Sequence, residues 1–296
     1  MTIYNSKSRI WESRDKTVTK EVLKPGTFSR KPTERSECHI YINSVEVTGT
    51  PAINLKNELQ SEILESNEKT IIIGDANSEI DRKIERGIQM MMLGEESLFT
   101  IRVSPLSNEN EDIVKCTIKL NNFKPFKAIW DWTPEEKYEI ALKYKETGVC
   151  LYKELRYVEA FHKFSQACKI LITLEPIPDL ELDKSLENNI NTLRIILYNN
   201  LAGCHLVREN FEHAVKLCDK VLEKDENNVK ALYRRGVAYG KLRNIEKAVP
   251  DLKKVITLEP HNAAAKEQFL IYNKKLQEAN QRSKDMVKRM FKAQLG

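Results

Sequence analysis

Apolar and polar residues alternate in two segments in the first half of the chain. Between 98 and 103 one face is apolar, and between 114 and 120 the apolar residues are separated by lysine or threonine. The apolar residues are Phe99, Ile101 and Val103 in the first segment and Val114, Cys116, Ile118 and Leu120 in the second. Because successive side chains of a strand point to opposite faces, both segments are predicted to be half-buried strands.

Further β-branched segments lie at 40–47 and 69–73, and one short helical segment is expected between 80 and 92. An antiparallel sheet with one short helix is therefore predicted for residues 17–125. The preceding segment, 1–16, is polar and basic. We expect it to be a disordered tail.

The second half of the chain changes to helical spacing. Three stripes of small and medium apolar residues lie at i, i+4 and i+7, which is one face of an α-helix. The stripes are Ala160, Phe164 and Ala167; Ala214, Cys218 and Val221; and Ala248, Leu252 and Val255. A small residue precedes each stripe by twelve positions, at Gly148, Ala202 and Gly236.

The stripes recur at a fixed offset. A helix pair that recurs with a period of about 34 residues is the signature of the tetratricopeptide repeat (TPR). The second and third stripes are offset by one such period, and the first and second by one period plus a 20-residue insertion. An ordinary helical bundle is the alternative, but it does not explain the fixed offsets. Such pairs stack into a superhelix with a concave face, because no pair can bury its stripe alone.

The chain is therefore predicted to be an α+β protein in which an N-terminal antiparallel β domain precedes an all-α TPR superhelix. We expect a linker at 126–136, three repeats within 137–262 and a long C-terminal helix over 263–296. The repeats are placed at about 137–172, 189–226 and 229–262. The capping pattern Thr133-Pro134-Glu135-Glu136 marks the start of the first helix.

Composition narrows the function classes. The net charge of +5 comes from 48 basic and 43 acidic residues, which is typical of a solvated surface rather than of a nucleic-acid interface. The six cysteines and five histidines have no metal-ligand spacing, and no glycine-rich phosphate loop occurs. We expect no metal or cofactor. No apolar run approaches the length needed to span a membrane, and no signal peptide is found. We therefore expect a cytosolic protein, with a nuclear pool as an alternative.

One motif lies at the predicted short helix. Glu85-x-Gly87-x-x-x-Met91-x-x-Gly94-Glu95, followed at once by a strand, resembles the motif of the FK506-binding protein (FKBP) type of prolyl isomerase. In that family the motif reads Trp-Glu-x-Gly and then Met-x-x-Gly-Glu. The segment 22–26 is similar to the family's first strand and turn. The resemblance implies an FKBP-like fold for 17–125.

The residues with which that family holds its proline differ in this chain. The tryptophan of the pocket floor falls on Ile84, the pocket tyrosine on Ile42, and the Val-Ile pair on Ile80–Asp81. No counterpart of the Phe-Asp segment is found near 54–66, and only 104–111 remain for the flap. The resemblance together with these differences implies a degenerate FKBP-like domain, which keeps the fold of the family but lacks its catalytic residues. An active prolyl isomerase is the alternative.

Four polar residues lie on the predicted first helices of the repeats, a few positions before the small residues. They are Lys145, Asn200, Lys230 and Arg234. Lys230 and Arg234 are four residues apart and share one helix face. Three cations and an amide on neighbouring helices predict a pocket for carboxylates, because arginine offers a planar fork and lysine a point charge.

This set resembles the carboxylate clamp with which co-chaperone TPR domains bind the C-terminal Glu-Glu-Val-Asp of Hsp90 and Hsp70. In that family the clamp reads Lys-x-x-x-Asn on the first helix, Asn on the third and Lys-x-x-x-Arg on the fifth. Val149 stands in place of the first asparagine.

The two resemblances together imply a non-enzymatic co-chaperone adaptor. It would bind Hsp90, with Hsp70 as an alternative, and would hold an unidentified client through the FKBP-like domain. We expect no nucleic-acid or membrane partner, and we assign no catalytic residue. A TPR scaffold for a complex without a chaperone is a further alternative.

Overall fold

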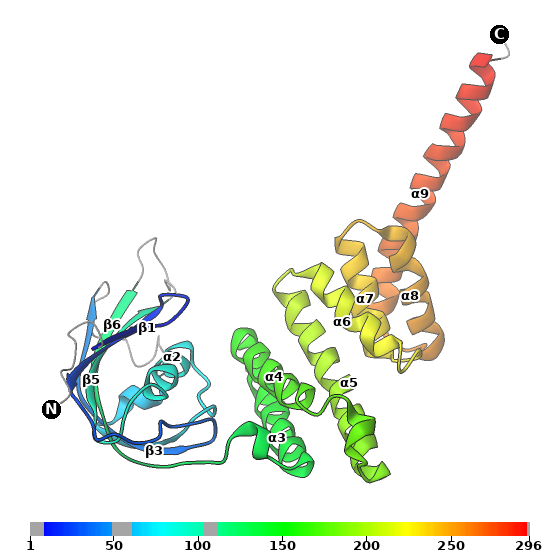
Figure 1. Ribbon diagram of the computed structural model, residues 1–296. Helices are drawn as coiled ribbons and strands as arrows, with labels where there is room; N and C mark the ends of the chain where they lie inside the picture. The colour runs from blue at the N-terminus through cyan, green and yellow to red at the C-terminus, as the bar shows by residue number, and fades with distance from the viewer. Residues whose placement is uncertain (1–8, 49–60, 104–111, 295–296) are drawn as a thin grey trace. The chain divides into compact units, whose positions relative to one another are not determined.

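The structure is a computed structural model that describes residues 9–48, 61–103 and 112–294. The chain divides into two compact units, Met1–Trp132 and Thr133–Gly296. The first contains a six-stranded antiparallel sheet and the second is helical (Figure 1). The prediction of an α+β protein is confirmed.

The sheet has the strand order β1-β2-β5-β6-β3-β4, and every pair is antiparallel. Its strands are β1 Ile10–Glu12, β2 Val18–Lys24, β3 Glu37–Thr48, β4 Glu68–Ile72, β5 Glu96–Val103 and β6 Asp112–Lys124. The alternation of apolar and polar residues in β5 and β6 buries one face of each strand, as predicted. Phe99, Ile101, Val114 and Ile118 are fully buried on the inner face.

The expected disorder of 1–16 is wrong for residues 9–16. Strand β1 pairs with β2, with Ile10 opposite Glu21, and Trp11 packs against the hydrophobic core. Ser13 stabilises the turn between the two strands because its hydroxyl accepts a hydrogen bond from the Val18 amide at 3.0 Å. A three-residue strand carries little local signal, so its pairing partner decides its structure. Residues 1–8 lie outside the described residues.

Helix α2, Glu79–Ile88, packs inside the curve of the sheet (Figure 1). The Ser78 hydroxyl caps it by accepting a hydrogen bond from the Asp81 amide. Ile80, Ile84 and Ile88 point into the core, where they pack with apolar residues of the sheet. A 3₁₀ turn, η2, covers Ile63–Glu65.

The segment expected to be a linker, 126–136, is partly regular. A 3₁₀ turn, η3, covers Ile129–Asp131, and α3 begins at Pro134. The capping box of Thr133 and Glu136 is present in both directions, as the sequence predicts.

The helical unit consists of three helix hairpins and a long last helix. They are α3 Pro134–Lys153 with α4 Tyr157–Ile172, α5 Lys184–Val207 with α6 Phe211–Leu222, α7 Val229–Lys241 with α8 Ile245–Leu258, and α9 Ala263–Gln294. The insertion forms a 3₁₀ turn, η4, at Ile177–Leu180 and the first turns of α5, which the Asp183 carboxylate caps. Helix α5 therefore begins before the expected start of the second repeat at 189.

The turn inside each hairpin has the same backbone geometry. Leu155, Glu209 and Arg243 have positive φ angles of 63°, 58° and 62°. These three positions recur at the same offsets as the apolar stripes. No local signal predicts this conformation, because glycine, the usual residue for it, is absent from all three positions.

Candidate functional site

The first helices of the three hairpins lie side by side, because α3 contacts α5 and α5 contacts α7. The helices α3, α5 and α7 can be followed in Figure 1, and the four predicted site residues are all on them. They are Lys145 on α3, Asn200 on α5, and Lys230 and Arg234 on α7. Lys230 is exposed and the other three are half-buried. The cations and the amide are therefore carried by three successive helices.

Arg234 reaches from its own helix across α5. Its Nη1 donates a hydrogen bond to the backbone carbonyl of Asn199 at 2.6 Å. The guanidinium lies over Gly203, where a Cβ atom would be 3.2 Å from Nη2. Burial raises the pKa of Tyr152 on α3, and the positive charge of Arg234 partly opposes this rise. The guanidinium is thus held close to the surface of α5 and acts electrostatically on α3.

The other three site residues have few competing contacts. Lys145 Nζ lies 3.7 Å from the exposed carboxylate of Glu146, a surface ion pair that contributes little. Within the described ranges, Lys230 forms no ion pair and the Asn200 amide has no hydrogen-bond partner. These polar groups are therefore available to a ligand.

Asn199, which the sequence did not single out, supports this arrangement. Its side chain is 6% exposed, and its amide donates a hydrogen bond to the Asn228 side chain at 3.1 Å. Asn228 also caps α7 by accepting a hydrogen bond from the Ala231 amide. Asn199 thus joins α5 to the start of α7, while its carbonyl holds Arg234. Nothing in the Asn-Asn pair indicates which residue is buried.

Arg235 is a second residue that the sequence did not reveal. Its guanidinium donates two hydrogen bonds to Asp251 on α8, both at 2.8 Å, and one to Asp219 on α6 at 2.8 Å. The hydrogen bonds that Arg235 donates to Asp251 and then to Asp219 hold its pKa above its usual range. This cation is satisfied by the fold, whereas its neighbour Arg234 faces α5.

In the sheet unit, the residues that match the FKBP motif have structural roles. Glu85 accepts hydrogen bonds from the Gly74 and Ala76 amides, at 3.1 and 3.0 Å. Gly87 lies against Phe99, whose ring would overlap a Cβ atom at position 87. Glu95 forms a buried ion pair with Lys20. The motif is explained by the fold alone.

The two isoleucines at the expected pocket positions are part of the hydrophobic core. Ile84 is 0% exposed and Ile42 is 2% exposed. The Asp81 carboxylate accepts hydrogen bonds from the Ser61 hydroxyl and the Glu62 amide, the latter at 2.8 Å, and so fixes η2. The expected loss of the flap at 104–111 lies outside the described residues, as does 54–60 of the region 54–66.

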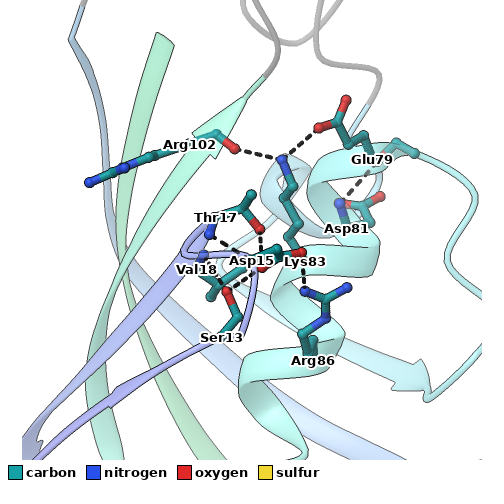
Figure 2. A network of polar contacts seen from close by, with 10 residues as sticks. Ser13, Asp15, Thr17, Val18, Glu79, Asp81, Lys83, Arg86 and Arg102 are labelled. Carbon is teal, nitrogen blue, oxygen red and sulfur yellow. Dashed lines mark hydrogen bonds and ion pairs between the residues drawn. The ribbon is translucent and has the colours of Figure 1, made fainter. Parts of the chain in front are cut away.

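A polar network attaches α2 to the edge of the sheet (Figure 2). Arg86 donates to Asp15 in the β1–β2 turn at 2.7 Å, and Lys83 donates to the Arg102 carbonyl of β5 at 2.6 Å. Hydrogen bonds from Ser13 and then Arg86 hold the pKa of Asp15 well below its usual range. The network holds the outer side of α2 in place.

The described residues contain no group of three or more His, Cys, Asp or Glu side chains placed to hold a metal ion. Burial raises the pKa of five thiols to about 12, so these thiols are protonated and unreactive at neutral pH. They belong to Cys38, Cys116, Cys168, Cys204 and Cys218. None of the helices described is long and apolar enough to span a bilayer.

Comparison with known families divides the chain at the same place as the fold. A family model described as "BDBT FKBP like N-terminal" matches residues 11–125. A model described as "Bride of doubletime-like, TPR domain" matches residues 133–216, and a tetratricopeptide-repeat model matches 229–262.

Curated relatives match this chain over most of its length. Human "Peptidyl-prolyl cis-trans isomerase FKBP4" is 28% identical over 292 residues, which are 95% of this chain and 61% of that protein. "FK506-binding protein-like" of Mus musculus is 29% identical over 263 residues, 88% of this chain and 67% of that protein. The chain thus spans less than two thirds of the human protein.

A solved structure has a similar fold. The crystal structure of residues 1–211 of CG17282 matches with a TM-score of 0.56 and 25% identity. The match covers 69% of this chain and 96% of the solved one.

Proposed function

We propose that this chain, which belongs to the proteins that combine an FKBP-like domain with tetratricopeptide repeats, is an Hsp90 co-chaperone adaptor. The helical unit would bind the acidic C-terminal peptide of the chaperone, and the FKBP-like domain would hold a client. The observation that carries this proposal is the placement of Arg234 over Gly203 of α5, the helix that also carries the side-chain amide of Asn200.

The chemistry of these residues fits a peptide that ends in carboxylates. Arg234 and Lys230 would bind the acidic side chains, and Lys145 and Asn200 the terminal carboxylate. Charge-assisted hydrogen bonds of this kind contribute about 1.5–3 kcal/mol each. Val149 provides no hydrogen bond where the clamp has an asparagine, so one contact is missing.

We further propose that the FKBP-like domain is not an isomerase. Prolyl isomerases of this family hold proline against an aromatic floor, whereas Ile84 and Ile42 are aliphatic and packed in the core. The carboxylate of Asp81 is occupied with fixing η2. A surface that binds a client without turnover is consistent with these three residues. Two binding units in one chain would raise the client's effective concentration at the chaperone.

The adaptor proposal also names a chaperone partner and a cellular compartment. Hsp90 is the partner we propose first, with Hsp70 as the second, and the cytoplasm as the site of action, with a nuclear pool. The second candidate function is a scaffold for a complex without a chaperone. Two observations support it: the match to the Bride of doubletime-like TPR model, and Val149 in place of the clamp asparagine.

Calorimetric titration with the peptide Met-Glu-Glu-Val-Asp tests the clamp. Arg234→Ala and Lys230→Ala are each expected to weaken binding about tenfold or more, because a charge-assisted hydrogen bond is lost. Lys253→Ala removes a charge from an exposed position on α8 and is the matched control. If all three variants bound the peptide with the affinity of the unsubstituted chain, the clamp would be excluded. Binding should also weaken with salt.

A prolyl-peptide turnover assay on the whole chain tests the second half of the proposal. We expect no rate above that of the uncatalysed isomerisation. Clear turnover would show that Ile84 and Ile42 do not abolish the activity. Affinity purification with and without the Arg234→Ala substitution then separates the adaptor from the scaffold, because a scaffold without a chaperone would keep its partners.

A further inference from the structure

A cleft of about 470 Å³ lies between α7 and α9. Apolar and aromatic side chains line it: Tyr233 and Val237 from α7, and Ile271 and Tyr272 from α9. The Tyr272 ring lies against Gly240, since a Cβ atom there would overlap the ring. The Tyr272 ring can therefore pack against α7 because position 240 has no side chain.

Helix α9 takes the place of the first helix of a fourth repeat. It begins at Ala263, one repeat period after the start of α7 at Val229. Ala265, one period after Ala231, is fully buried as Ala231 is. The space between α7 and α9 is thus equivalent to the spaces between α3 and α5 and between α5 and α7.

This correspondence places the cleft in line with the clamp. Gln268 occupies the repeat position of Arg234 in α7 and of Asn200 in α5. Tyr233 occupies the position of Lys145 in α3. Both residues line the cleft. The cleft is therefore the continuation, by one repeat, of the groove that carries the four clamp residues.

The rim of the cleft is positively charged. Lys241, Arg243 and Lys275 line it, and no Asp or Glu among the described residues does. None of the three cations forms an ion pair within the described residues, and Lys275 lies over the Tyr272 ring at 5.9 Å. The charge of Glu267 adds to burial in raising the pKa of Tyr233. Apolar and aromatic side chains beside three cations complement an apolar side chain flanked by carboxylates.

We propose that this cleft is a second subsite for the same acidic peptide, and that it takes an apolar side chain with a neighbouring carboxylate upstream of the terminus. The proposal rests on the proposed function. Lys241 lies seven positions after Arg234 on α7, which is about 10 Å along the helix axis. Neighbouring helices lie about 8–10 Å apart, and an extended chain rises about 3.3 Å per residue. The side chain would therefore lie about three to five residues before the residue that contacts Arg234.

Three peptides test the subsite by calorimetry. The first is Met-Glu-Glu-Val-Asp, the second adds Glu-Phe-Glu-Leu-Gly-Ser before it, and the third adds six Gly and Ser residues instead. We expect the second peptide to bind about tenfold more tightly than the other two, since it adds one buried apolar side chain and two ion pairs. Lys241→Ser/Lys275→Ser and, separately, Ile271→Glu should abolish this gain and leave the affinity for the first peptide unchanged.

The matched control is Lys216→Ser/Lys253→Ser, which removes the same charge from exposed positions on the second helices α6 and α8. It should keep the gain. Equal binding of all three peptides, with Arg234→Ala still disruptive, would overturn the subsite and leave the clamp intact. A gain that survives both cleft variants would also overturn it.

A fourth peptide, Glu-Phe-Glu-Leu blocked at both ends, separates the cleft from the clamp. It lacks the terminal carboxylate that Lys145 and Asn200 are proposed to bind. We expect it to shift the amide NMR signal of Gly240, and the Lys241→Ser/Lys275→Ser variant to lose this shift. If the first peptide does not bind but this shift is seen, the proposed function fails and the cleft remains. No shift and no gain would overturn the cleft.

Discussion

Phe164 occupies the space that the missing side chain of Gly148 leaves, since a Cβ atom at position 148 would lie 2.6 Å from Cε1 of Phe164. The equivalent pair in the third hairpin is Gly236 and Leu252, where the distance would be 2.9 Å. In each hairpin the small residue of the first helix and the residue sixteen positions later on the second helix fit together in size. This fit fixes how closely the two helices approach.

The Gly148→Ala substitution should destabilise the helical unit by about 1–3 kcal/mol, because Phe164 must move in a packed core. The second hairpin has alanine and cysteine at the equivalent positions, Ala202 and Cys218. Adding Phe164→Cys to Gly148→Ala should therefore cost less than the sum of the two single substitutions. Urea denaturation of the four proteins measures this coupling, and strict additivity would refute the size-matching argument.

The hairpin turns predict a stabilising substitution. Leu155 has a φ angle of 63° and is 70% exposed, so its side chain makes little contact that could compensate for the strain. Leu155→Gly should raise the free energy of unfolding by about 0.5–1 kcal/mol, the left-handed strain less the flexibility that glycine adds to the unfolded chain.

Glu154→Gly, one residue earlier at a φ angle of −78°, is the control for the turn. Glycine relieves no strain there and should lower the stability. If thermal denaturation showed that both variants change the stability in the same direction, backbone strain at Leu155 would not explain the effect of Leu155→Gly.

The buried ion pair of the sheet unit predicts a large loss. Lys20 and Glu95 are each 5% exposed, and Glu95 also accepts hydrogen bonds from the Met92 amide and the Ser97 hydroxyl. Lys20→Met leaves this carboxylate buried without its cation and should cost about 3–5 kcal/mol. Lys24→Met is the control, since Lys24 pairs with Glu96 at 2.8 Å but is 75% exposed. Its cost should be below about 1 kcal/mol, measured by urea denaturation.

The adjacent asparagines of α5 predict two different effects. Asn199→Ala removes a hydrogen bond to Asn228 at a buried position and should cost about 1–3 kcal/mol of stability. Asn200→Ala should leave the stability within about 0.5 kcal/mol and weaken binding of Met-Glu-Glu-Val-Asp about tenfold. Thermal denaturation and calorimetry on both variants distinguish these effects. Weakened binding without any stability loss in Asn199→Ala would contradict the assignment.

The repeats could be predicted because their signal is local and periodic. Each stripe, such as Ala160, Phe164 and Ala167, lies within eight consecutive residues and recurs at a fixed offset. The alternation in β5 and β6 is local in the same way. The FKBP resemblance predicts that Ile84 and Ile42 replace two residues of the proline pocket. Both are buried in the core of the sheet unit, and the replacement of the pocket stays a prediction.

The remaining features depend on partners far away in the chain. Strand β1 is defined by β2, and Arg235 by two carboxylates, each sixteen residues away on another helix. The position of Arg234 over Gly203 requires the packing of α7 on α5, which no local pattern determines. The cleft likewise depends on Tyr272 meeting Gly240. Residue spacing predicted the helices that carry the four candidate site residues, but not the side-chain contacts.

A stacked pair of histidines joins α5 to α6. The rings of His205 and His213 lie 5.4 Å apart at an interplanar angle of 21°, and Phe161 of α4 meets His205 edge-on. Burial, and then the neighbouring His213 and Arg208, hold the pKa of His205 below its usual range. Protonating His205 would place a second cation beside Arg208 within this packed group.

The pH dependence of stability follows from the sign of this shift. The neutral form of His205 is favoured in the folded state, so its contribution is fully present above the unfolded pKa of about 6.5 and is lost as the pH falls below it. The helical unit should therefore lose stability as the pH falls below about 6.5, and His205→Gln should reduce that loss. His261→Gln, at an exposed position before α9, is the control and should leave the loss unchanged. Urea denaturation across this range decides the question, because equal pH dependence in the wild type and His205→Gln would exclude His205 as the titrating group.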